Sequence, residues 1–264
     1  MAIDLPDLAD LAPSPGAAPV SRMIAAQAAA ETRSLLRNGE QLLLTLIIPL
    51  LLLAAFSLEP LVSFGGGISR IDFMTPGVIA LAVMSTAFTS QAIATGFERR
   101  YGVLKRLGAT PLSRGGLITA KTTTVIVVEL LQCVLIVVVG LIIGWRPHAR
   151  VAAIVVVPLL IALGTAAFSG LALAMAGTLR AEATLAAANL VYIVLLGVGG
   201  VIFPLTKFPA GARHFFELLP TGALSTGLRS VLAYHVPFPV GNTVTLLVWS
   251  VAMIAVAARV FRWE

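Results

Sequence analysis

Few side chains in this sequence have the type and setting that chemistry requires, and Glu129 is the most informative of them. It is the one acidic residue inside a long apolar segment, and Gln132 and Cys133 follow it three and four positions later. On a helix these three residues share one semi-polar face. A charge in hydrocarbon costs on the order of 3 kcal/mol or more, so Glu129 must be paired, protonated or in contact with water.

Two interpretations of this face remain open. In the first, Glu129, Gln132 and Gln91 line a path along which a solute moves. In the second, Glu129 forms only a structural hydrogen bond between two helices.

No arrangement typical of an enzyme or a metal site can be placed. His148, His214 and His235 lie far apart, and no two carboxylates share an apolar segment. Residues 115–122 approach a phosphate-binding loop, but Ala120 stands where that loop requires glycine. We therefore expect no catalytic residues, no metal and no cofactor in this chain.

The composition indicates an all-α membrane protein. Apolar residues make up 58% of the 264 residues and charged residues 11%, which is far from the composition of a soluble domain. Several uncharged runs are long enough to cross about 30 Å of hydrocarbon as a helix. Pro49 within the first run requires a neighbour that satisfies the carbonyl it frees. We predict six transmembrane helices over 41–58, 74–97, 120–144, 151–178, 184–203 and 242–261.

The remaining segments do not span. Residues 1–20, with Asp and Pro but no basic residue, predict a disordered cytoplasmic tail, and 21–264 form a single membrane domain. Residues 22–39 predict an amphipathic helix on the membrane surface or an extension of the first span. Residues 204–241, divided by Pro and Gly, predict short re-entrant or interfacial helices between spans five and six.

Charge counts orient the protein. With both termini in the cytoplasm, the inner side carries twelve Lys and Arg residues and the outer side six, Arg229 among the latter. This bias is the one that the positive-inside rule describes, and it also explains the net charge of +6 without a nucleic-acid partner.

Two patterns indicate helix packing. Polar side chains in the second span should face other helices rather than lipid: Ser85, Thr86, Thr89, Ser90 and Gln91. Small side chains allow another helix to approach closely. In the fourth span they recur at every fourth residue: Ala162, Ala166, Gly170 and Ala174. At the end of the third span Gly140 and Gly144 form a GxxxG motif.

The stretch from Glu98 to Lys121 has a specific order as well as six basic residues. Its core reads Glu-Arg-Arg-Tyr-Gly-Val-Leu-Lys-Arg-Leu from Glu98 to Leu107, and Thr-Pro-Leu-Ser follows from Thr110. The order resembles a signature of type 2 ABC transporter permeases, between their second and third spans. Phe203-Pro204 and Leu219-Pro220 resemble a second element of that family, with Leu219 where Asn is common. The drug-export branch, similar to daunorubicin-resistance permeases, fits best.

This resemblance implies a multi-pass permease subunit of an exporter in a bacterial inner membrane, with both termini cytoplasmic. A separate ATPase, in two copies, would bind the ATP, and a second permease chain, identical or homologous, would complete the transporter. The substrate would be an amphipathic drug or a lipid. An alternative is a secondary transporter or channel without an ATPase partner, which would usually carry ion-coupling residues and inverted repeats.

The resemblance also implies a coupling helix in the loop, which docks on the ATPase. Residues 98–107 would form it, with Glu98 near its N-terminus, Arg99 and Arg106 exposed, and an end at Gly108 and Pro111. The predicted coupling residues are Glu98, Arg99, Arg100, Tyr101, Gly102, Leu104, Lys105, Arg106 and Leu107.

Overall fold

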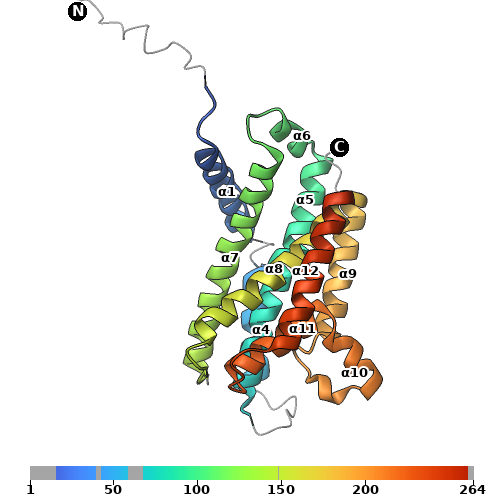
Figure 1. Cartoon of the computed structure of the whole chain (residues 1–264). Helices are drawn as coiled ribbons and strands as arrows, with labels where there is room; N and C mark the ends of the chain where they lie inside the picture. The colour runs from blue at the N-terminus through green and yellow to red at the C-terminus, as the bar shows by residue number, and fades with distance from the viewer. Residues whose placement is uncertain (1–15, 40–42, 59–67, 148, 261–264) are drawn as a thin grey trace, which may run out of the picture.

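The computed structural model describes residues 16–39, 43–58, 68–147 and 149–260, and this part of the chain consists of helices and their connections, with no strand. Figure 1 shows the long helices side by side, with α6 near one end of the bundle and α10 near the other. The predicted all-α class is confirmed. Most of the predicted tail (1–15), the loop residues 59–67 and His148 lie outside the described residues.

The centre of the bundle is one helical run from Arg70 to Arg100. It consists of α4 (Arg70–Met84), the π-helical segment η3 (Ser85–Ser90) and α5 (Gln91–Arg100). The most apolar stretch of this run, 18 residues long, is completely buried by the rest of the chain. The five polar side chains predicted to avoid lipid are buried as well, which confirms that prediction. The run starts four residues earlier than predicted because Ser69 caps it, accepting a hydrogen bond from the Asp72 N–H.

Four further helices are long and apolar enough to cross a membrane: α7 (Arg114–Ile143), α8 (Ala153–Thr178), α9 (Ala181–Val198) and α12 (Val240–Val260). Together with the central run they make this a multi-pass membrane protein. The first predicted span is represented by η2 (Leu43–Ile47) and α3 (Ile48–Leu58), which contain a shorter apolar helix, Thr45–Ser57. The described residues thus hold five full-length spans, and the count of six remains a prediction.

Helices α8 and α12 pack closely along their length. A Cβ atom on Gly170 would lie 2.7 Å from the carbonyl carbon of Met253 and 2.8 Å from the nitrogen of Ile254, so the α12 backbone requires a glycine there. At Gly170 the stripe of small residues therefore has its partner within the same chain, whereas Ala162, at its other end, is exposed. Gly144, in contrast, ends α7 with a φ of 111° and is a helix cap rather than a packing position.

Helix α7 takes a different course. It packs against α4, α3 and the N-terminal helix α1 (Val20–Arg37), while α8, which follows it in the sequence, packs on α12, α11 and the central run. Figure 1 shows α1 beside the part of α7 that is nearer to α6. α7 and α8 therefore diverge, and a cavity lies between them.

The end opposite α6 is closed by short helices. η4 (Leu205–Lys207), α10 (Ala210–Glu217) and α11 (Pro220–Leu232) lie between α9 and α12, and they are too short to span, as predicted. Arg229 on α11 is buried, donates to the carbonyls of Phe73 and Val201, and lies over the Phe73 ring. Arg229 thus connects α11 to the central run inside the protein, and its side chain is not exposed.

Candidate functional site

The charged part of the sequence signature lies at the C-terminal end of α5, and its side chains contact other helices of the same chain. Glu98 Oε2 accepts a hydrogen bond from Lys121 Nζ at 2.6 Å, which joins α5 to α7. The prediction that Glu98 lies near a helix N-terminus was wrong, because α5 continues through it to Arg100. The positive charge that stabilises the Glu98 carboxylate comes from Lys121, not from the N-terminus of a helix.

The two arginines that follow connect α5 to α8 and α9. Arg99 donates to the carbonyls of Gly177 and Leu179, at 2.6 Å and 2.5 Å, where α8 ends and its last carbonyls lack helical partners. Arg100 pairs with Glu182 in the first turn of α9. Arg99 is therefore half-buried and bound within the chain, whereas it was predicted to be exposed, and its contact with a partner stays a prediction.

The predicted helix over 98–107 is divided at Gly102. This residue has a φ of 68°, a left-handed conformation that glycine adopts at little cost. α5 ends there, and the separate helix α6 (Val103–Gly108) begins. Arg106 Nη2 donates to the Tyr101 carbonyl at 3.1 Å and so holds α6 against the end of α5. The predicted end at Gly108 is confirmed.

The Thr-Pro-Leu-Ser sequence makes the turn into α7. Thr110 Oγ1 donates to the Leu107 carbonyl at 2.6 Å, at the end of α6. Ser113 Oγ accepts from the Gly116 N–H at 3.1 Å and caps α7. Both hydroxyls thus satisfy backbone groups at helix ends, which accounts for this part of the signature by local structure alone.

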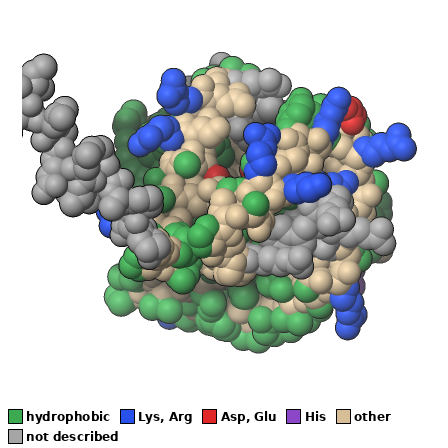
Figure 2. Space-filling model, turned by 90° about the horizontal axis from the view of Figure 1, so that it is seen from above, with side chains coloured by type: hydrophobic (Ala, Val, Ile, Leu, Met, Phe, Trp, Pro, Cys, Tyr) green, Lys and Arg blue, Asp and Glu red, His purple; other side chains and the backbone are tan. Residues whose placement is uncertain are grey.

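The side chains of the loop that face outward are fewer than predicted. Tyr101, Lys105 and Arg106 are exposed, Leu107 is half-buried and Leu104 is only 2% exposed. Figure 2, which looks onto this end of the molecule, shows several Lys and Arg side chains projecting from it. The exposed surface at this end is therefore formed by α6, the last turn of α5 and the exposed residues 108–111 that follow α6.

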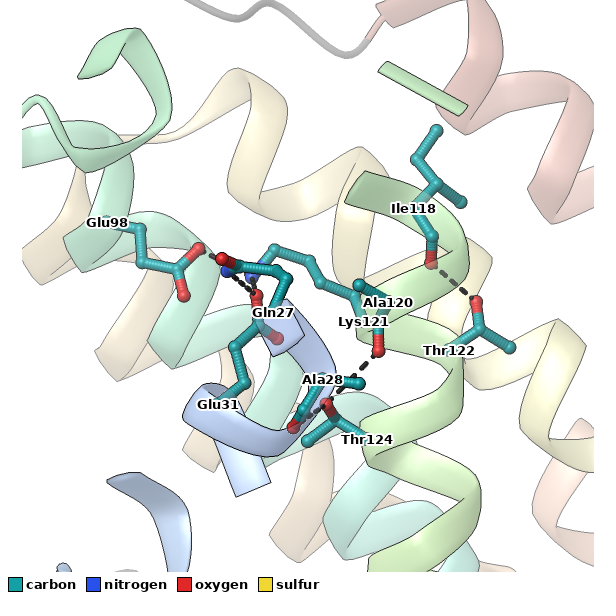
Figure 3. A network of polar contacts seen from close by, with 9 residues as sticks. All are labelled: Gln27, Ala28, Glu31, Glu98, Ile118, Ala120, Lys121, Thr122 and Thr124. Atoms are coloured by element: carbon teal, nitrogen blue, oxygen red, sulfur yellow. Dashed lines mark hydrogen bonds and ion pairs between the residues drawn. The ribbon is translucent and has the colours of Figure 1, made fainter. Parts of the chain in front are cut away.

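Lys121 is the centre of a buried network, drawn in Figure 3. Besides Glu98, its ammonium lies 3.3 Å from Glu31 of α1, and Gln27 donates to Glu31 at 2.8 Å. One turn further along α7, Thr124 Oγ1 donates to the Ala28 carbonyl at 3.2 Å. The network joins α1, α5 and α7, so the N-terminal helix is attached to the bundle; this helix ends at Arg37, because Asn38 has an extended conformation.

A cavity of about 830 Å³ lies between α7, α8 and α12 and reaches the start of α5 and α6. Its lining is mostly apolar, and Leu104 of α6 and Lys121 form part of its wall near the loop. The predicted path residues Glu129 and Gln91 also line it, but Gln132 does not. Two of the three candidates therefore meet in one space, although they are 38 positions apart in the sequence.

Glu129 uses only half of its carboxylate within the chain. Oε2 accepts a hydrogen bond from Thr165 Oγ1 of α8 at 2.7 Å. Oε1 is buried and has no hydrogen-bond partner among the described residues, and Glu129 as a whole is 3% exposed. The structural interpretation thus accounts for one oxygen and leaves the other unpartnered, on a residue that lines the cavity.

In Gln132, by contrast, both ends of the side-chain amide have a hydrogen-bond partner. Its Oε1 accepts from Thr86 Oγ1 of η3 at 2.8 Å, and its Nε2 donates to the Thr45 carbonyl of η2. Thr45 belongs to the π-helical segment η2, in the turn before Pro49, which has no N–H to donate. Gln132 thus donates to a carbonyl close to this proline, and it bridges two π-helical segments. Gln132 lies on the same side of α7 as Glu129, as their spacing implies, but the two side chains contact different helices, Gln132 η3 and η2 and Glu129 α8.

Three polar residues near this site escaped the sequence analysis. Thr165 and Ser169 lie four residues apart on α8 and both line the cavity, a spacing that the sequence does display. Glu31 faces Lys121 across 90 positions, and only the tertiary structure brings them together. Cys133 lines the cavity beside Glu129, as its position one turn later implies.

The fold and the site describe a multi-pass helical membrane protein with an open cavity between its helices and a basic loop at one end. The sequence model of the ABC-2 type transporter matches residues 24–233, which is most of the chain. The chain therefore belongs to the ABC-2 type transporter family, whose members are transport permease components. No curated protein matches the sequence.

Proposed function

We propose that this chain is the permease subunit of an ABC exporter that moves an amphipathic drug or lipid-like substrate out of the cytoplasm, powered by a separate ATPase. The observation that carries the proposal is that α6 has two roles. Its exposed Lys105 and Arg106 form a surface at the end of the bundle, while its buried Leu104 is part of the cavity wall. A force applied to α6 from outside therefore acts directly on the cavity.

The ionic contacts of α5 extend this connection. Because Glu98, Arg99 and Arg100 hold α7, α8 and α9, a displacement of the loop pulls on three spans at once. Closure of two ATPase subunits on ATP would move α6 and so change the access of the cavity. The structure thus supports a transmission role for Glu98, Arg99 and Arg100, and a docking role for Tyr101, Lys105, Arg106 and the neighbouring Leu107.

The cavity suits an amphipathic substrate. Its wall is mostly aliphatic, and its few polar groups include Glu129 and Gln91. Ligand sites in proteins are commonly apolar pockets of about 300–1,000 Å³ with a few fixed polar groups. A substrate would enter between α7 and α8, from the inner leaflet or the cytoplasm.

The proposed assembly contains two permease chains, identical or homologous, and two ATPase subunits in a bacterial inner membrane. Both termini and α6 would be cytoplasmic. In support of this orientation, the exposed residues Arg100, Lys105, Arg106, Arg180 and Arg259 lie at helix ends on the α6 side of the bundle.

The test is purification of the tagged full-length chain from the membranes of its own host, followed by mass spectrometry for an ABC ATPase. We expect an ATPase to co-purify, and the double charge reversal Lys105→Glu with Arg106→Glu to reduce its recovery at least tenfold. Arg213→Glu, on α10 at the opposite end of the bundle, is the matched control and should leave recovery unchanged.

Two results would contradict the proposal. ATPase activity of the purified chain without a partner would place the energy source in the wrong polypeptide. Substrate movement driven by an ion gradient, in vesicles that contain the chain alone, would favour the secondary transporter or channel.

A further inference from the structure

We propose that the cavity selects organic cations, and that the carboxylate of Glu129 binds their ammonium group. This inference rests on the proposed function, because it names the substrate class of the same cavity. It depends on which polar atoms of the lining already have partners and which do not.

The unsatisfied atoms of the cavity are oxygens. Oε1 of Glu129, Oε1 of Gln91 and Oγ of Ser169 are buried and have no hydrogen-bond partner within the described part of the chain, and all three residues line the cavity. Glu129 and Gln91 are more than nine-tenths buried. A buried polar atom without a partner is costly, so a ligand that donates hydrogen bonds to these oxygens would be favoured.

The charge balance of the lining points the same way. Lys121 is the only Lys or Arg among the lining residues, and its ammonium is already shared by Glu98 and Glu31. One ammonium between two carboxylates leaves no positive charge for a substrate anion. Glu129 lies two turns deeper in the cavity and has no Lys, Arg or His partner among the described residues, so its charge is available to a cation.

The rest of the lining sets the form of such a cation. Around Glu129 lie Ile126, Leu130 and Ile161, and Ile254 and Leu173 follow from α12 and α8. A ligand must therefore combine an ammonium group with an apolar body. An anion would meet Glu129 without a compensating cation, and a neutral alcohol would leave its charge uncompensated.

The experiment compares three pyrene probes that differ in the head group: 1-pyrenemethylamine, 1-pyrenemethanol and 1-pyrenecarboxylate. Binding to the full-length chain in lipid nanodiscs is measured by fluorescence anisotropy, with empty nanodiscs as the baseline for partition into lipid. We expect the amine to bind at least tenfold more tightly than the alcohol, because charge-assisted hydrogen bonds are the stronger ones. The carboxylate should show no binding above the baseline.

Variants then locate the preference. Glu129→Gln keeps the size and the contact with Thr165 but removes the charge, and it should bring amine and alcohol to similar affinity. Glu129→Asp should retain part of the preference. Glu217→Gln, the same chemical change on α10 far from the cavity, should leave all three probes unchanged.

Equal binding of amine and alcohol by the unmodified chain would overturn the inference, and so would an amine preference that survives Glu129→Gln. The comparison within the unmodified chain decides the matter even if Glu129→Gln fails to fold. Failure of the proposed function is a separate result, since these measurements need neither ATP nor an ATPase. A selective cavity in a chain that recruits no ATPase would contradict the exporter but not the cation site.

Discussion

Glu129 and Gln132 lie one turn apart on α7 and are almost equally buried, yet they have opposite surroundings. Gln132 uses both ends of its amide, toward η3 and η2. Glu129 uses one oxygen toward α8 and leaves the other without a partner among the described residues. The difference shows that burial and polarity alone do not identify a functional residue in a membrane helix. What distinguishes the two is whether the chain itself satisfies the side chain.

The largest expected effect concerns Gln132, whose amide is fully engaged with other helices, and it is a loss of stability. Gln132→Leu removes two buried interhelical hydrogen bonds, one with Thr86 of η3 and one with the Thr45 carbonyl of η2. We expect a loss of about 2–3 kcal/mol in the free energy of unfolding. Thermal unfolding in detergent micelles measures it, as a clear drop in the midpoint. Glu129→Gln is the control on the same helix and should change the midpoint far less. Equal destabilisation by both would remove the distinction between them.

A middle-sized effect tests the wall of the cavity. A methyl group at Gly170 would strike the backbone of α12, which cannot move without separating the two helices. Gly170→Ala should therefore cost about 1–3 kcal/mol of stability, as overpacking does elsewhere. Gly197→Ala on α9 is the matched control, because no atom lies within 4 Å of its added Cβ, and it should be neutral or slightly stabilising. A stable Gly170→Ala variant would show that α8 and α12 are farther apart than the structure has them.

The smallest effect sharpens the comparison with one chemical change at two places. Thr86→Val removes the donor to Gln132, and Thr165→Val removes the donor to Glu129. Each should lower the free energy of unfolding by about 0.6 kcal/mol, the average for such bonds within membranes. Only Thr165→Val should change probe binding, because it frees the second oxygen of Glu129. If Thr86→Val altered the affinity for 1-pyrenemethylamine as strongly, the hydrogen bonds of Gln132 would influence binding at Glu129, and the two residues could not be separated in function.

Much of the fold could be predicted from the sequence because membrane spans are determined by local composition. Uncharged runs located five long helices to within about six residues, and the polar side chains of the second span were correctly expected to face other helices. The boundaries failed where a single residue decides them. Gly102 divides the expected coupling helix, and Ser69 starts α4 early. Such positions depend on backbone conformation and capping, which composition does not report.

The candidate site was predicted in its members but not in its arrangement. Glu129 and Gln91 were identified from their chemistry, and the structure brings them to one cavity. Gln132 was grouped with Glu129 by spacing, but it faces the π-helical segments. Arg99 was expected to be exposed, but it is half-buried and caps α8. Spacing along a helix limits which side chains share a face, and the neighbouring helices decide which of them find partners.

The sequence by itself determined that this protein lies in a membrane, where its spans are, and that its basic loop belongs to the ABC-2 type transporter family. These properties depend on residues that are close together in the chain. Only the tertiary structure decided that Glu31, Glu98 and Lys121 form one network and that one oxygen of Glu129 is left without a partner among the described residues. The reason is physical: a buried polar atom is satisfied or unsatisfied by what packs against it, and that contact comes from helices far away in the sequence.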